Sequence, residues 1–411
     1  PAVPMTTSDT TRPRLRALVG DDERFLADRW ERDLWRSKGS PERADQFGAW
    51  LSSDDLVTLI ADHGLRNPFF RLIRDGGSLA PGDYLRSAGA GHTTVHDLAN
   101  PGRVAEEVWA GASIVGQALQ RVWPPLRGLC RGPAAELGHR VQANAYLSPP
   151  DAEGFDLHYD THDVFVLQVE GTKQWSVHAP ADELPHRRRS TSPCPAFGDE
   201  VWAGELTPGD CLYLPRGFGH RARTSDQASL HLTIGVLAFT WRHVLRLLAD
   251  LLPEDDVELR RALPVGALGD RAGGGGLDQA WDEFRARLAT GLAGLDPEVL
   301  VERLERDLWS AHPPVDGGDE VRRALRRTEP DATTRLVLRP EALEWHEVQD
   351  GRVRLVRRDR VVSLPEAALP LVEALLTGHA VRATDGLIDL ESGLVVLRRL
   401  HREGLVTQAP R

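Results

Sequence analysis

The segment His158-Tyr-Asp-Thr-His-Asp-Val-Phe-Val-Leu-Gln-Val-Glu-Gly-Thr-Lys-Gln-Trp175 decides the fold that this sequence predicts. Its β-forming run 164–169 ends at a Glu-Gly turn, and the chain then returns along 173–178, which is typical of a hairpin. In an extended chain, residues two apart lie on the same face, so His158 and Asp160 can point to one metal ion. A His-x-Asp pair alone is a weak signal, and the hypothesis needs a third ligand.

The third ligand comes from a second pattern, Gly209-Asp-Cys-Leu-Tyr-Leu-Pro-Arg-Gly-Phe-Gly-His220, which fits G-x5-P-x-G-x2-H. Gly209 turns the chain into a strand, Pro215 ends that strand, and Gly217 allows a second bend. His220 is then expected to point inward from the next strand. This pattern resembles the second motif of the cupin fold, and the resemblance is specific because four fixed positions match.

His158, Asp160 and His220 together form a set of two histidines and one carboxylate, which is typical of non-haem Fe(II) oxygenases. Three protein ligands leave open positions at the metal for a co-substrate and O2. His162 has the same strand parity as His158 and Asp160, so a zinc site closed by four ligands is the main structural rival. The other alternative is that these histidines are buried packing residues.

Short strands at near-regular spacing between about residues 140 and 238 predict a β-sandwich or barrel. Helical patterns precede this region at 21–66 and 101–119, and others follow it at 240–327. From 333 onward, an Asp-Gly hairpin signal and two helical stretches suggest a winged-helix module. We therefore expect an α+β chain in three parts: N-terminal helices with a catalytic domain (1–238), a helical region (239–327) and a winged-helix-like domain (328–411).

The composition of the 411-residue chain limits the classes of partner. Its net charge of −11 disfavours nucleic-acid binding and favours a basic partner, such as an Arg-rich peptide. Cys130, Cys194 and Cys211 lie far apart, which argues against a disulfide framework or a cysteine zinc site and fits a cytoplasmic protein. We find no apolar run long enough to span a membrane.

The segments 144–180 and 215–236 resemble the JmjC-type ribosomal oxygenases, also called the cupin-4 family. The expected order of parts is similar too: N-terminal helices, a JmjC double-stranded β-helix, a helical dimerisation region and a C-terminal winged helix. The resemblance is tightest over 144–236 and loosest after 320. It implies Fe(II) as the metal, 2-oxoglutarate as co-substrate and a homodimer.

The resemblance also implies residues that hold the co-substrate. Lys173 occupies the position where the family places a cation for the far carboxylate of 2-oxoglutarate. Lys173 and Lys38 are the two lysines among 50 basic residues, which favours a specific role, although a lysine just past a turn is also common on a surface. Asn144, Tyr146 and Thr233 are candidates for the wall of the same pocket, with ordinary strand residues as the alternative.

The activity that the resemblance implies is hydroxylation of an Arg or His side chain in a ribosomal protein. A hydroxylase that tailors a ribosomally made peptide is an alternative with the same chemistry. A non-catalytic, cupin-like regulatory protein is an alternative of another class, but the near-neutral charge of 335–411 makes direct DNA binding unfavourable. The basic run Arg187–Arg189 either contacts a ribosomal or RNA surface or is a solvated loop.

Overall fold

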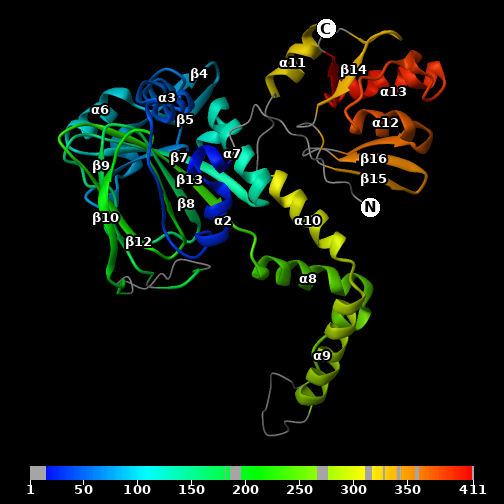
Figure 1. Ribbon diagram of the computed structural model, residues 1–411, viewed down its shortest axis with the longest axis horizontal. Coiled ribbons are helices and arrows are strands. Elements are labelled where there is room, and N and C mark those ends of the chain that lie inside the picture. The colour runs from blue at the N-terminus through cyan, green and yellow to red at the C-terminus, as the bar shows by residue number, and fades with distance from the viewer. Residues whose placement is uncertain are drawn as a thin grey trace. The chain divides into compact units, whose positions relative to one another are not determined.

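The computed structural model in Figure 1 describes residues 15–180, 182–185, 196–265, 276–310, 317–326, 329–339, 343, 345–356 and 361–409. The basic run 187–189 and Cys194 lie outside these residues. Eleven strands between residues 35 and 237 form the β-core, and their pairings are antiparallel. The structure therefore has the α+β character and the strand-rich centre that the sequence predicts.

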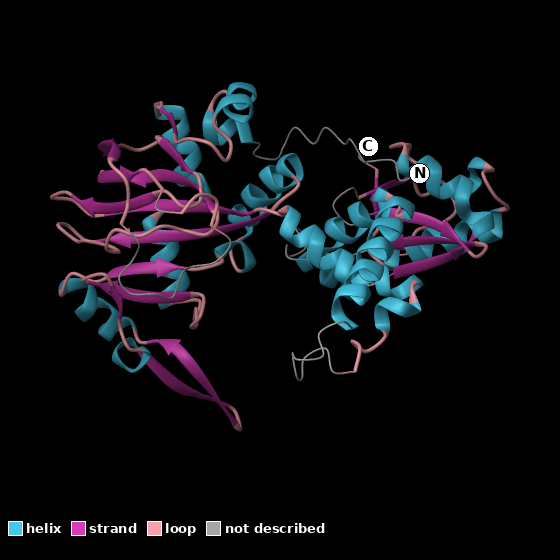
Figure 2. Cartoon of the chain, turned by 90° about the horizontal axis from the view of Figure 1, so that it is seen from below, coloured by secondary structure: helices cyan, strands magenta, loops and turns pink. Residues whose placement is uncertain are grey.

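The core consists of two sheets, and Figure 2 shows its strands running side by side with helices at the margins. The strands of the larger sheet are β1 (Trp35–Ser37), β2 (Phe70–Arg74), β3 (Gly77–Ser78), β6 (Ser113–Gly116), β7 (Arg140–Ser148), β8 (Asp163–Glu170), β11 (Cys211–Leu214) and β13 (Ser229–Leu237). Those of the smaller sheet are β9 (Lys173–His178), β10 (Glu200–Leu206) and β12 (Gly219–Thr224). The strand orders are β1-β11-β8-β13-β7-β6-β2-β3 and β10-β9-β12.

An apolar layer between the two sheets holds them together. Val164 and Val166 of β8 pack in one cluster with Trp175 and Val177 of β9, and each of these side chains is at most 6% exposed. The residues alternate along both strands because successive side chains point to opposite faces. Full burial of such a side chain contributes about 1.5–3 kcal/mol. The same alternation directs Lys173, two residues before Trp175, into the space between the sheets.

The N-terminal helices cover the opposite face of β8. Phe165, whose neighbours Val164 and Val166 point inward, lies with its ring 5.6 Å from Phe25 and 5.0 Å from Tyr213. The helices of this part are α1 (Leu15–Val19), α2 (Asp22–Asp28), α3 (Pro41–Trp50), α4 (Ser53–Ala61), α5 (Pro81–Tyr84), α6 (Pro101–Trp109), the 3-10 turn η1 (Leu119–Arg121) and α7 (Pro124–Leu137). A hairpin of β4 (Leu85–Ala90) and β5 (Thr93–Ala99) completes it.

The helical patterns are broken more often than we expected. The predicted helix 101–119 ends at Trp109, and its second half is instead the buried strand β6, which pairs with β2 and β7. Sheet pairing overrides the helical periodicity there because the run at β6 is apolar on both faces. Within 21–66, β1 interrupts the helices, and α4 begins with a capping box of Ser52 and Asp55.

Residues Phe239–Trp309 form a separate compact unit of helices. Its helices are α8 (Trp241–Asp255), the 3-10 turn η2 (Val257–Arg260), α9 (Gly276–Gly294) and α10 (Pro297–Ser310, which extends one residue beyond the unit). None of the described helices combines the length and apolar character that crossing a membrane requires. The domain boundaries that we expect at 238/239 and 327/328 stay predictions.

The C-terminal region has its own apolar core, to which Val353, Leu371 and Leu397 contribute. Its elements are α11 (Gly317–Arg326), β14 (Leu336–Leu338), β15 (Trp345–Gln349), β16 (Arg352–Val356), β17 (Val361–Pro365), the 3-10 turns η5 (Glu366–Ala368) and η6 (Ala383–Asp385), α12 (Leu369–Leu376), α13 (Leu390–Arg402) and β18 (Val406–Gln408). The expected Asp350-Gly351 turn joins β15 to β16, with both residues at positive φ. The winged-helix assignment stays a prediction.

Candidate metal centre

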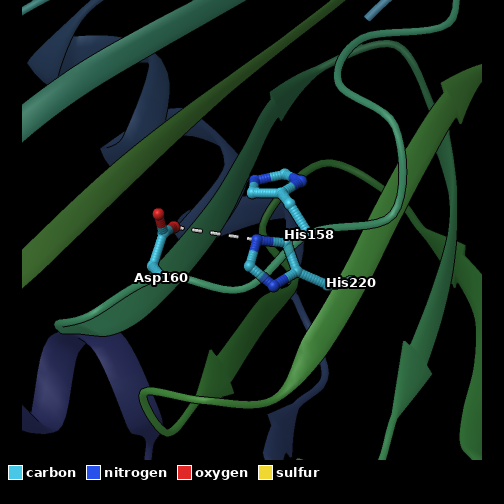
Figure 3. Close-up of side chains that lie close together, drawn as sticks. All are labelled: His158, Asp160 and His220. Carbon is cyan, nitrogen blue, oxygen red and sulfur yellow. Dashed lines mark ion pairs between the residues drawn. The ribbon is translucent and has the colours of Figure 1, made fainter. Parts of the chain in front are cut away.

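His158, Asp160 and His220 lie together inside the β-core (Figure 3). Each offers one ligand atom, and these atoms all lie within 4.8 Å of one another. The Nε2 atom of His220 is 3.7 Å from an Oδ atom of Asp160. Across the described ranges, this is the one group of three or more His, Cys, Asp or Glu side chains arranged closely enough to hold a metal ion.

The backbone brings the two motifs together in a way that the sequence did not predict. His158 lies outside the regular strands and forms an isolated antiparallel bridge with His220 of β12. The two residues exchange backbone hydrogen bonds, with N–O distances of 3.2 and 2.7 Å. The backbone N–H of Gly217 donates to the carbonyl oxygen of Asp160 at 3.0 Å. Thus the bend at Gly217, where φ is 94°, joins the second motif to the first.

The orientation of both imidazoles fits a metal. The Nδ1 atom of His158 is 2.7 Å from the carbonyl oxygen of Asp156, and that of His220 is 3.1 Å from the carbonyl oxygen of Phe218. A carbonyl oxygen only accepts, so each Nδ1 carries the proton and donates it. Each Nε2 then presents a lone pair, which is the arrangement that histidine ligands of metals commonly have.

The described residues do not form the alternative zinc site, in which His162 would be a fourth protein ligand. The ring of His162 packs against Gly235 of β13, where an added Cβ atom would lie 2.7 Å from His162 Cδ2. His162 is not a member of the metal-binding group. The group therefore has three protein ligands, which leaves room at a metal for further ligands.

Lys173 is buried in the same cavity as the triad, with 2% of its surface exposed. Its Nζ atom donates to Ser148 Oγ at 2.9 Å and lies 3.5 Å from His231 Nδ1. Burial lowers the pKa of the Lys173 ammonium to about 7. Within the part of the chain that the structure describes, no carboxylate forms an ion pair with this ammonium. A buried cation in such surroundings fits a site for an anion.

The other predicted pocket residues have different positions. Tyr146 and Thr233 line the cavity, and the Tyr146 ring stacks on His231 at a centroid distance of 4.8 Å. Asn144 serves a neighbouring turn, where its Oδ1 atom accepts a hydrogen bond from the backbone N–H of Ala118 at 3.0 Å. Of these three candidates, the structure thus brings Tyr146 and Thr233 to the triad.

The cavity residues that the sequence analysis did not assign to the site include Ser148, Phe155 and His231. Ser148 could have been found, because it is the next inward-facing residue after Tyr146 on β7. The ring of His231 packs against Tyr146 and Trp175 and also lies beside Lys173. Phe155 precedes His158 in an irregular segment, where no periodicity indicates its direction.

Comparison with known proteins agrees with this site. Residues 133–244 match the JmjC domain model. The chain is 41% identical over 133 residues to the bifunctional lysine-specific demethylase and histidyl-hydroxylase NO66 of Drosophila persimilis, and 41% identical over 140 residues to ribosomal oxygenase 1 of Rattus norvegicus. These matches cover 30% and 31% of this chain but 19% and 23% of the relatives, so the chain spans about a fifth of their length.

Solved structures extend the likeness to the whole fold. The structure of the Escherichia coli ribosomal oxygenase YcfD aligns with 95% of this chain and 98% of its own, with a TM-score of 0.52 and 20% identity. A second YcfD structure, in complex with cobalt and 2-oxoglutarate, aligns with a TM-score of 0.52 and 19% identity. The α+β cupin core predicted from the sequence is confirmed.

Proposed function

We propose, from the premise that residues 133–244 are a JmjC domain, that this chain is an Fe(II)- and 2-oxoglutarate-dependent oxygenase that hydroxylates a protein or peptide side chain. One observation carries the proposal: a two-histidine, one-carboxylate group and a buried lysine ammonium line the same cavity. The first suits a redox metal with open positions, and the second suits a dicarboxylate. A cupin that only binds a partner needs neither feature.

The donor set fits Fe(II). Two neutral imidazoles and one carboxylate are the ligands of the facial triad in non-haem iron oxygenases. When bound there, iron together with 2-oxoglutarate would supply the oxidising chemistry that consumes O2. The chain's own contribution is to hold the two Nε2 atoms and the carboxylate close together. The backbone hydrogen bonds of His158, Asp160 and His220 fix that arrangement before any ligand binds.

The cavity walls suit the co-substrate. Lys173 and Ser148 would bind the far carboxylate of 2-oxoglutarate, the ammonium by charge and the hydroxyl by a hydrogen bond. Tyr146 and Thr233 would line the path between that carboxylate and the triad. The packed layer between the sheets, with Val164 and its neighbours at most 6% exposed, excludes water from the closed side.

We propose a ribosomal protein as the substrate and an Arg or His side chain as the target. The names of the relatives support this choice, because they include ribosomal oxygenases and histidyl-hydroxylases. The net charge of −11 also supports it, because ribosomal proteins are basic and an acidic enzyme attracts them. Intact-mass measurement would show a gain of one oxygen atom on the substrate.

We also propose that Phe239–Trp309 mediates a homodimer. Three of its large side chains are strongly exposed: Trp241 at 83%, Leu245 at 66% and Trp281 at 54%. Exposed apolar surface of this kind is typical of association sites. Light scattering on the wild type and on a Leu245→Arg variant tests this, and a wild-type monomer at micromolar concentration would contradict it.

The decisive experiment measures succinate formation from 2-oxoglutarate with Fe(II), both without and with ribosomal proteins. Asp160→Ala removes the carboxylate ligand and should abolish succinate formation and weaken metal binding measured by calorimetry. Asp226→Ala is the matched control, because Asp226 is an exposed residue in the turn between β12 and β13. If Asp160→Ala forms succinate at the wild-type rate, the proposal is wrong.

A further inference from the structure

A large apolar groove lies on the side of the larger sheet opposite to the catalytic cavity. Its volume is about 630 Å³. Helix α4 contributes Val57 and Ile60, helix α6 contributes Val104 and Val108, and Leu147 of β7 forms part of the floor. The next residue of β7, Ser148, borders both the groove and the inner cavity. The two spaces therefore lie on either side of one strand.

The groove exposes apolar side chains to solvent. Trp109, the last residue of α6, is 91% exposed, and Val57 of α4 is 47% exposed. Ala105 of α6, which also lines the groove, is exposed as well. Contiguous apolar surface in a concave site is typical of a binding surface, whereas single exposed apolar residues are ordinary.

The charges beside the groove are mostly negative. Asp54, Asp62, Glu106 and Asp151 directly follow lining residues in the sequence, and all four are exposed. In the described part of the chain, none of these four carboxylates forms an ion pair. Arg103 is the exposed basic residue that adjoins the lining, and its guanidinium donates to the carbonyl oxygen of Gly82. An apolar groove with an acidic margin is complementary to a cationic segment with apolar anchor residues.

We propose that this groove binds a basic segment of the substrate polypeptide, remote from the residue that is hydroxylated. Large apolar side chains of the segment would fill the space between α4 and α6, and its Arg or Lys side chains would pair with Asp54, Asp62, Glu106 and Asp151. The inference rests on the proposed function, since it supplies a second contact for the same basic protein. An anionic membrane surface is disfavoured because these carboxylates would repel it.

The test uses a fluorescein-labelled 15-residue peptide of alternating Arg and Leu, titrated with the full chain and followed by anisotropy. We expect saturable binding, and at least tenfold weaker binding by Val57→Asn and by the double variant Asp54→Lys with Glu106→Lys. All three positions are exposed, so the variants should fold. Asp45→Lys, an equally exposed acidic position on α3, is the control and should bind as the wild type does.

Two further peptides and one lipid vesicle test which chemistry the groove recognises. Replacing Leu by Ser or Arg by Glu in the peptide should abolish binding. Unchanged affinity of the groove variants overturns the inference, as does binding of the Glu peptide, or binding of phosphatidylserine vesicles in place of the Arg-Leu peptide. Succinate formation without substrate is measured in the wild type and in the same variants: if the wild type forms succinate but does not bind the Arg-Leu peptide, the groove inference alone fails. If the wild type forms no succinate, the proposed function fails.

Discussion

Two buried charged sites in the same β-core have opposite surroundings. Asp163, fully buried at the start of β8, accepts hydrogen bonds from Tyr213 Oη at 2.9 Å and from the Arg216 guanidinium at 2.7 Å. Arg216 also forms an ion pair with Glu31 at 2.6 Å. Lys173, which is 2% exposed, has a serine hydroxyl and a histidine ring beside its ammonium instead.

This difference distinguishes Asp163, a buried charge with a structural role, from Lys173, a buried charge with a role in ligand binding. A buried carboxylate whose hydrogen bonds are complete, as at Asp163, has its desolvation offset by its partners, so the removal of one member of the pair is strongly destabilising. A buried ammonium without a carboxylate partner destabilises the folded state by itself, so its presence indicates a ligand that brings the missing negative charge. Asp163 should therefore matter for stability, and Lys173 should matter for co-substrate binding.

The largest effect, a loss of folding stability, is expected from substitution of Asp163. Asp163→Ala leaves the Arg216 guanidinium without its main partner and should lower the free energy of unfolding by about 3–5 kcal/mol. Urea denaturation followed by circular dichroism measures this change. Asp226→Ala, at an exposed turn, is the control and should change the free energy by less than about 0.5 kcal/mol. Equal free energies of unfolding for Asp163→Ala and Asp226→Ala would contradict the structural role of Asp163.

The Lys173→Met variant tests the role of Lys173 in binding the co-substrate. It keeps the length of the side chain but removes the ammonium, so 2-oxoglutarate should bind about 100-fold more weakly, as expected for loss of a charge-assisted hydrogen bond worth about 3 kcal/mol. Without co-substrate, the same variant should be as stable as the wild type or more so, because a desolvated charge is gone. Calorimetry with Mn(II) and 2-oxoglutarate, together with urea denaturation, gives both values. A variant that loses stability but keeps its affinity for 2-oxoglutarate would reverse the roles of the two sites.

The pH dependence of binding sharpens the assignment. Burial lowers the pKa of Lys173 from 10.5 to about 7, so the free protein loses the ammonium as pH rises through about 7. Affinity for 2-oxoglutarate should then fall by up to about tenfold per pH unit above that value. Lys173→Arg stays charged, so its affinity should be nearly constant between pH 6 and 9. A wild-type affinity as flat as that of the arginine variant would exclude titration of Lys173.

The same shift has a consequence for stability. Between pH 7 and 10.5 the unfolded chain holds a proton on Lys173 that the folded chain lacks. Stability without ligand should therefore rise with pH across this window, relative to Lys173→Met. Below pH 7 both states are protonated and the difference between the two proteins becomes constant. A wild-type curve that falls relative to the variant over the same range would contradict the lowered pKa.

The family resemblance, rather than strand parity, singled out Lys173 in the sequence. The alternation along β9 gives the physical reason why Lys173 lies with Trp175 on the inner face, and the Gly217 bend explains why His220 points inward. The sequence could not predict the path of residues 151–162, because this segment is irregular. His158 pairs with His220 there through one isolated bridge. Nor could the sequence predict Asn144 Oδ1 as the acceptor for the Ala118 backbone, since that contact depends on tertiary packing.

The smallest effect, a modest loss of affinity for 2-oxoglutarate, is expected at Ser148. Ser148 Oγ accepts hydrogen bonds from Lys173 Nζ at 2.9 Å and from Ser113 Oγ at 2.8 Å. If the ammonium is the main partner of the co-substrate, Ser148→Ala removes one neutral hydrogen bond, about 1 kcal/mol, and 2-oxoglutarate binds about fivefold more weakly. Ser113→Ala is the control, because Ser113 contacts Ser148 without lining the cavity, and it should change the affinity by less than about twofold. A loss at Ser148 as large as that of Lys173→Met would mean that the hydroxyl, rather than the charge, recognises the carboxylate.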